Sequence, residues 1–137
     1  MESFEYYLEN GLIKKSGPNK ERAMALINDA HDRIKDALSL DAKKFPKIVF
    51  EQIYDALRDF CDAILFIDGF KPYSHEATIS YLIKKNFDIS EIKELDIFRY
   101  KRNGSKYYGK KIFIEDATEI LDFYKSTKNK FDSLFKK

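Results

Sequence analysis

The sequence predicts an all-α protein, an antiparallel up-and-down bundle of five to six helices that forms a single domain over residues 1–137. Three observations support this fold class. Apolar residues recur every three or four positions through most of the chain, which is the period of one helix face. Only five glycines and three prolines are present, too few for the many turns of an all-β fold. A chain of this length with 44% hydrophobic residues can bury its own core.

The first half of the chain divides into three predicted helices. Residues 3–15 form a short amphipathic helix that ends at residues 16–18, and a second helix follows and runs to Leu38. Residues 41–45 link it to the longest helix, which begins at Pro46 because proline is tolerated in the first helical turn. We expect this third helix at the centre of the bundle, since its apolar face is broad. That face comprises Val49, Ile53, Leu57, Phe60, Ile64 and Ile67, widened by Tyr54, Cys61 and Leu65.

A loop and a short helix follow. Residues 68–73 are predicted to form the loop, because Gly69 can end a helix in the left-handed conformation and Pro72 prevents its continuation. Ser74 is the expected N-cap of a helix that runs to residue 84 or 85.

Two further helices complete the bundle. Asp88 and Glu91 have the spacing of a capping box, with Asp as the cap, and open the first of them. This helix should end near Asn103 and Gly104. A final helix is predicted from about residue 114 to residue 135, and no internal repeat or domain boundary is visible.

Composition narrows the class of protein. No apolar run approaches the roughly 20 residues of a membrane span, so we expect no membrane association. The N-terminus is acidic and mixed, which argues against a signal peptide. The single cysteine, Cys61, excludes an internal disulfide and permits no cysteine-rich metal site. We therefore expect a soluble cytoplasmic protein that uses no metal and no cofactor.

The most informative stretch is residues 99–111. It holds six basic residues and no acidic one, whereas the whole chain has 25 basic and 23 acidic residues. Three tyrosines lie between these cations. Cations and stackable rings together bind phosphate and base, although a solvated helix end that complements the helix dipole has the same composition. The residues are Arg99, Lys101, Arg102, Lys106, Lys110 and Lys111, with Tyr100, Tyr107 and Tyr108.

Arg99 and Arg102 lie three positions apart and therefore share a helix face. Two guanidinium groups on one face can bind a phosphate bidentately. Lys106 extends this face only if the helix continues, and Gly104 argues against that.

Only two histidines are available for acid–base chemistry near neutral pH, His31 and His75. His31 lies beside the apolar stripe of the second helix, with no second ligand nearby to complete a metal site. His75 follows Ser74 at a predicted helix start, where it either bonds to the backbone or serves as an accessory site residue. The chain has no glycine-rich phosphate loop and no His-Glu-x-x-His motif.

Four short motifs follow one another in the second half of the chain. They are Tyr54-Asp55-Ala56-Leu57-Arg58, Asp68-Gly69-Phe70-Lys71, Ser74-His75-Glu76-Ala77 and Arg102-Asn103-Gly104-Ser105-Lys106-Tyr107-Tyr108-Gly109. In this order and spacing they resemble an archaeal-type HEPN domain protein. The resemblance covers about residues 50–135, and the helices predicted upstream are compatible with it.

The resemblance implies a helical bundle that forms a homodimer, with the polar motif of residues 102–109 at or near the interface. Many proteins of this family are metal-independent ribonucleases, often toxins of toxin–antitoxin pairs whose partner is a small nucleotidyltransferase. Their hallmark is an arginine, a polar residue (often asparagine) directly after it, and a histidine after an interval of four to six residues. Arg102 and Asn103 match the first half of this motif, and Tyr107 stands at the histidine position.

This departure bears on catalysis. Metal-free RNA cleavage through the 2′-hydroxyl needs a proton acceptor near neutrality, and a tyrosine with a pKa around 10 is a poor one. No histidine follows His75 in the chain. A related group carries a modifiable tyrosine two residues beyond the histidine, but Tyr108 lies only one residue beyond Tyr107. We therefore predict that Arg102 and Asn103 are binding groups.

The leading hypothesis is a protein that binds RNA or a nucleotide without efficient catalysis. One alternative is an active metal-independent endoribonuclease toxin that uses Arg102, Asn103 and Tyr107. The other is a structural subunit for dimerisation or for docking a nucleotidyltransferase. The predicted binding residues are Arg99, Arg102, Asn103, Lys106, Tyr107 and Tyr108, with His75 as an accessory candidate.

Overall fold

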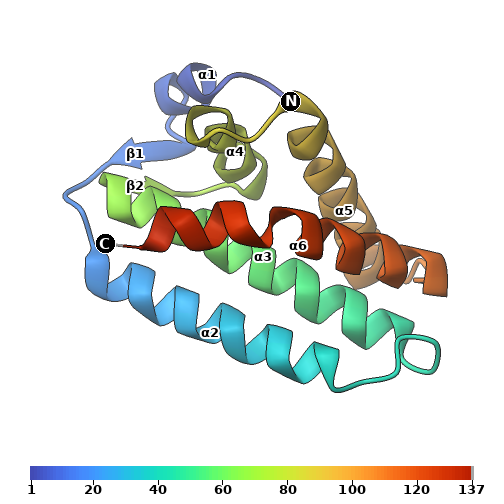
Figure 1. Cartoon of the computed structure of the whole chain (residues 1–137). Helices are drawn as coiled ribbons and strands as arrows, with labels where there is room; N and C mark the ends of the chain where they lie inside the picture. The colour runs from blue at the N-terminus through green and yellow to red at the C-terminus, as the bar shows by residue number, and fades with distance from the viewer. Residues whose placement is uncertain (137) are drawn as a thin grey trace.

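Helix α3 (Pro46–Asp68) lies at the centre of the bundle, as Figure 1 shows for the computed structural model, which describes residues 1–136. Pro46 occupies the first turn, and Gly69 ends the helix in the left-handed conformation with φ +90°, both as predicted. Twelve of its 23 residues are buried. A helix that is covered on so much of its surface must be packed against several neighbours, which confirms its predicted central place.

Two other long helices pack against α3 (Figure 1). Helix α2 (Lys20–Leu38) runs antiparallel to it, and α6 (Ile114–Phe135) runs parallel to it. The Asn19 side chain accepts a hydrogen bond from Arg22 N at 3.0 Å and so caps α2. The all-α bundle and both helices are therefore confirmed. Within residues 1–136, no helix has the length and apolar character that crossing a membrane requires.

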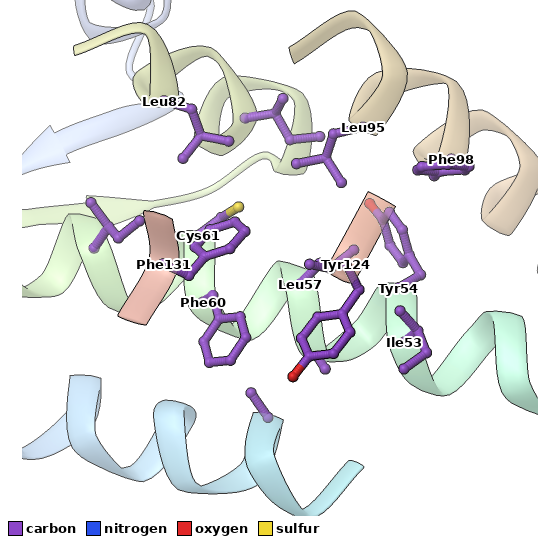
Figure 2. Close-up of a cluster of buried hydrophobic side chains, with 14 of the residues drawn as sticks. Ile53, Tyr54, Leu57, Phe60, Cys61, Leu82, Leu95, Phe98, Tyr124 and Phe131 are labelled. Atoms are coloured by element: carbon purple, nitrogen blue, oxygen red, sulfur yellow. The ribbon is translucent and has the colours of Figure 1, made fainter. Parts of the chain in front are cut away.

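The core lies between α3 and the helices that cover it (Figure 2). The Phe60 ring of α3 stacks on Phe131 of α6, with 5.2 Å between the ring centroids. The Phe98 ring of α5 (Ile89–Tyr108) meets Phe50 edge-on at 6.1 Å. Cys61 is buried as an unpaired thiol in this core, as its place on the apolar face predicted.

The N-terminal segment differs from the prediction. The helix expected over residues 3–15 ends early, as α1 (Phe4–Glu9), because Gly11 turns the chain with φ +74°. The chain then forms strand β1 (Ile13–Lys15), which pairs antiparallel with β2 (Phe70–Pro72) inside the segment predicted to be a loop. Pairing between segments so far apart in the sequence leaves no local pattern, and so the strands were missed.

The segment after β2 begins as predicted and then changes helix type. Ser74 caps α4 (His75–Ser80) by accepting a hydrogen bond from Ala77 N at 3.3 Å. A 3-10 helix, η1 (Tyr81–Lys85), completes the range that was predicted as one short helix. The Asp88–Glu91 capping box then opens α5 as predicted.

Helix α5 runs further than predicted, and this difference shapes the site. Gly104 lies inside the helix and is buried, and the helix ends at Gly109, with φ +63°. Lys110 folds back and donates its backbone N–H to the Gly104 carbonyl oxygen at 3.0 Å. A Cβ on residue 104 would lie 3.1 Å from the Lys110 side chain, so the glycine serves close packing and does not end the helix. Lys106 and Tyr107 therefore stand on helical turns.

Candidate functional site

Side chains from α3, α4 and α5 enclose a small hollow of about 40 Å³, which we call the polar hollow. Helix α3 contributes three residues, α4 contributes its first residue and α5 contributes the other four. The lining residues are Tyr54, Asp55, Arg58, His75, Arg102, Asn103, Lys106 and Tyr107. Four predicted binding residues and the accessory candidate His75 thus meet in one place.

The α3 wall is part of a polar stripe on an otherwise buried helix. Glu51, Asp55, Arg58 and Asp62 follow one another at intervals of four, three and four residues, which places them on one helix face. Arg58 Nε lies 3.9 Å from Asp62 Oδ2, and the Arg58 side chain is 43% exposed. So long and solvated an ion pair is weak, so the Arg58 guanidinium can bind an incoming anion.

Arg102 is held in place by two carboxylates of α3. Its Nη1 lies 2.6 Å from Glu51 Oε2, at an angle that does not form a hydrogen bond, and its Nε lies 3.4 Å from Asp55 Oδ1. The side chain is only 16% exposed. Arg102 therefore joins α5 to α3 and forms an inner wall of the polar hollow.

Lys106 and Tyr107 form the outer rim. Lys106 is exposed and has no ion pair within the described residues 1–136, and its Nζ lies 5.3 Å from the centroid of the Tyr107 ring. Tyr107 is 65% exposed. An unpaired ammonium group beside an exposed aromatic ring can bind phosphate and stack on a base.

His75 lies against these cations at the start of α4. Burial of its ring and the positive charges of Arg58 and Arg99 lower its pKa to about 4. Its imidazole is therefore neutral at pH 7, with one nitrogen that donates a hydrogen bond and one that accepts. The structure thus brings a histidine into the site, although none occurs at the sequence interval of the HEPN motif.

Two predicted residues lie apart from the polar hollow. The Arg99 guanidinium is bound by Asp96 at 2.7 Å and Glu76 at 3.1 Å, and its side chain is only 11% exposed. The Glu76 ion pair joins α5 to α4, and Arg99 does not line the polar hollow beside Arg102 as its spacing suggested. Tyr108 is 77% exposed on the last turn of α5 and does not line the hollow.

A partly exposed ion-pair cluster adjoins the polar hollow through Asp55. Arg33 Nη1 of α2 lies 3.8 Å from Asp55 Oδ2, and Arg33 Nε lies 2.8 Å from Asp29 and 3.7 Å from Asp59. Asp59 Oδ2 is buried without a hydrogen-bond partner. Burial and the neighbouring Asp29 raise the pKa of Asp59 to about 8. Asp59 therefore holds its proton to a higher pH than an ordinary aspartate does.

Tyr54, Asp55 and Arg58 were missing from the predicted binding residues, although they belong to one of the quoted motifs. Their signal in the sequence is the polar stripe itself. Charged residues at helical spacing on the most apolar helix need partners from another helix. The stripe does not say which helix supplies them.

The charge of the polar hollow is positive. Its lining holds three cationic side chains and one carboxylate, a net charge of +2 while His75 is neutral. The cations are Arg58, Arg102 and Lys106, and the carboxylate is Asp55. Within residues 1–136, no three His, Cys, Asp or Glu side chains are grouped so as to hold a metal ion. The lining groups are thus suited to an anion.

No family model, curated protein or solved structure matches this chain. The resemblance to HEPN proteins therefore stays a prediction that rests on the four motifs.

Proposed function

We propose that the chain is an HEPN-like helical protein that binds RNA or a nucleotide at the polar hollow. One observation carries the proposal. Cations and aromatic rings that are distant in the sequence, Arg58 on α3 and Lys106 and Tyr107 on α5, converge on one positively charged hollow. Cations with an exposed ring are the groups by which proteins bind single-stranded nucleic acid.

Within this proposal the two exposed groups make the ligand contacts. Lys106 binds phosphate because no carboxylate of the described residues competes for it, and Tyr107 stacks on a base. Arg102 is already paired with Glu51 and Asp55, so it mainly shapes the hollow and adds positive potential.

We expect Lys106→Ala to weaken the binding of single-stranded RNA and to reduce its salt dependence. Each phosphate contact releases counterions, so removing one lowers the slope of log K against log salt concentration by about 0.7. The measurement is a fluorescence anisotropy titration of a labelled oligoribonucleotide at several salt concentrations. Lys125→Ala, on the exposed face of α6, is the matched control, since it removes the same charge away from the site.

The opposite result is a Lys106→Ala protein that binds RNA as wild type does, or wild-type binding that does not respond to salt. Either would contradict the proposal. The same samples, kept with a chelator, also report cleavage of the RNA. RNA that stays intact supports a binding protein without efficient catalysis.

The second candidate function is a metal-independent endoribonuclease, the toxin of a toxin–antitoxin pair. The observation that favours it is the half-buried imidazole of His75 in the polar hollow. A neutral imidazole can accept the proton of a 2′-hydroxyl, the task for which Tyr107 is unsuited, and His75 would do so as a weak base because its pKa is lowered to about 4. RNA cleavage by wild type that is lost in both Arg102→Ala and His75→Gln would establish this function in place of simple binding.

The proposed assembly is a homodimer that forms through α5. Ile89, Ile97 and Tyr100 are between 53% and 65% exposed and follow one side of this helix. Such an apolar stripe on a helix surface indicates an interface. It continues from an apolar groove beside α1.

Ile97→Glu is therefore expected to convert a dimer into a monomer, because it places a charge in the centre of the stripe. Sedimentation velocity at micromolar concentration measures the change. Ile48→Glu, on the exposed side of α3, is the control and should leave the dimer intact. A wild-type chain that is monomeric throughout would contradict the proposed assembly.

On the same resemblance, we propose a small nucleotidyltransferase as the partner and the cytoplasm as the location. The four motifs support the partner, and a chain whose one cysteine is unpaired suits a reducing compartment.

A further inference from the structure

We propose that the polar hollow takes a terminal phosphate, the phosphomonoester of a mononucleotide or of an RNA end, in preference to an internal phosphodiester. This inference rests on the proposed function and names the class of ligand for the same site. It is argued from the size of the hollow, its charge and its walls.

The size of the hollow fits one phosphoryl group. Its volume is about 40 Å³, whereas one water molecule occupies roughly 10–15 Å³ of such space. The hollow therefore has room for a few oxygen-sized atoms, which suits the oxygens of one phosphoryl group. It is too small for a nucleobase, so the base must lie outside, at the exposed ring of Tyr107.

The charge of the hollow also favours a terminal phosphate. The lining cations Arg58, Arg102 and Lys106 exceed the single carboxylate of Asp55 by two charges. A phosphomonoester carries close to two negative charges at pH 7, whereas a phosphodiester carries one. The monoester is therefore attracted more strongly to these cations than the diester is, and the neutral imidazole of His75 adds a hydrogen-bond donor without changing the charge.

The walls restrict how a chain can pass. On the inner side, Tyr54 is 3% exposed and Arg102 is 16% exposed, so the hollow is closed there and opens on the side of Arg58, Lys106 and Tyr107. An internal phosphodiester bears a nucleoside on each of two oxygens, and both must leave through that one opening. A terminal phosphate bears only one, which can leave past Tyr107.

Isothermal titration calorimetry of the full chain at pH 7 and low salt tests the inference. The probes are 5′-AMP, 3′-AMP, adenosine and the dinucleoside monophosphate ApA. We expect 5′-AMP or 3′-AMP to bind at least tenfold more tightly than ApA, and the better of the two identifies the kind of end. Adenosine should give no measurable binding, and Lys106→Ala should lose most of the AMP affinity while Lys125→Ala keeps it.

A pair of oligoadenylates with and without the terminal phosphate extends the test to RNA. If both bind equally and Lys106→Ala weakens both, RNA binding at the hollow stands and the preference for an end is overturned. If AMP binds wild type and Lys106→Ala equally, the phosphate lies elsewhere and the inference is also overturned. If neither RNA nor any nucleotide binds, the proposed function itself fails.

Discussion

Phe131→Ala is expected to lower the free energy of unfolding by about 3–5 kcal/mol, the usual cost of removing a buried phenyl ring from a packed core. Phe131 is completely buried in α6, where its ring stacks on Phe60 at 5.2 Å and meets Phe87 at 4.9 Å. Figure 2 shows it between the helices of the core. The loss should be large because both partner rings come from other elements and cannot close the cavity without moving them.

Urea denaturation followed by circular dichroism measures this change. Phe113→Ala is the control, because the Phe113 side chain is 55% exposed just before α6 and should cost far less. Phe131→Leu, which keeps most of the buried volume, should lie between the two. Equal unfolding midpoints for Phe131→Ala and wild type would contradict the central place of this ring.

Asp59→Asn is expected to stabilise the protein increasingly as the pH rises from 5 to 8. The pKa of Asp59 is about 8 in the folded chain, because the side chain is buried and lies beside Asp29, and about 3.9 in an unfolded chain. Between these values the folded state holds a proton that the unfolded state releases. The free energy of unfolding of wild type therefore falls as the pH rises, by up to about 1.4 kcal/mol per pH unit.

Asparagine at position 59 is neutral at every pH and resembles the protonated acid. The variant should match wild type near pH 5 and exceed it near pH 8, as thermal or urea unfolding at each pH would show. The difference between the two proteins isolates this group, because other titrating residues, His75 among them, affect both alike. Asp122→Asn on the exposed face of α6 is the control and should show no such trend. A difference that is constant with pH would show that Asp59 is ionised throughout.

The sequence by itself determined the long helices and most of their ends, with the end of α5 as the exception. Pro46 and Gly69 bound α3 through backbone conformations that those residue types favour, and Asp88 with Glu91 opens α5 through a local capping box. The apolar periodicity then assigned the buried faces of these helices. Signals of this kind act within a few residues, so they can be read before any tertiary contact is known.

The tertiary structure decided the two strands and the true end of α5. β1 and β2 are separated by more than 50 residues in the sequence. A three-residue strand is too short for its sequence pattern to indicate which distant segment it pairs with. Gly104 was interpreted as a helix end because that is the commonest role of glycine after a helical stretch. Its actual role, making room for Lys110, depends on how the chain returns after Gly109.

The candidate site was also predicted only in part from the sequence. The basic stretch on α5 was visible in the sequence, and it supplies Arg102, Asn103, Lys106 and Tyr107. Arg58 and His75 complete the polar hollow only because α3 and α4 pack against α5, which the sequence does not show. The same packing removes Arg99 from the site, since Glu76 and Asp96 bind its guanidinium. Residue types and their spacing are local properties that the sequence shows directly. The ion-pair partners of a charged side chain depend on how the helices pack. Those partners determine which cations remain available to bind a ligand.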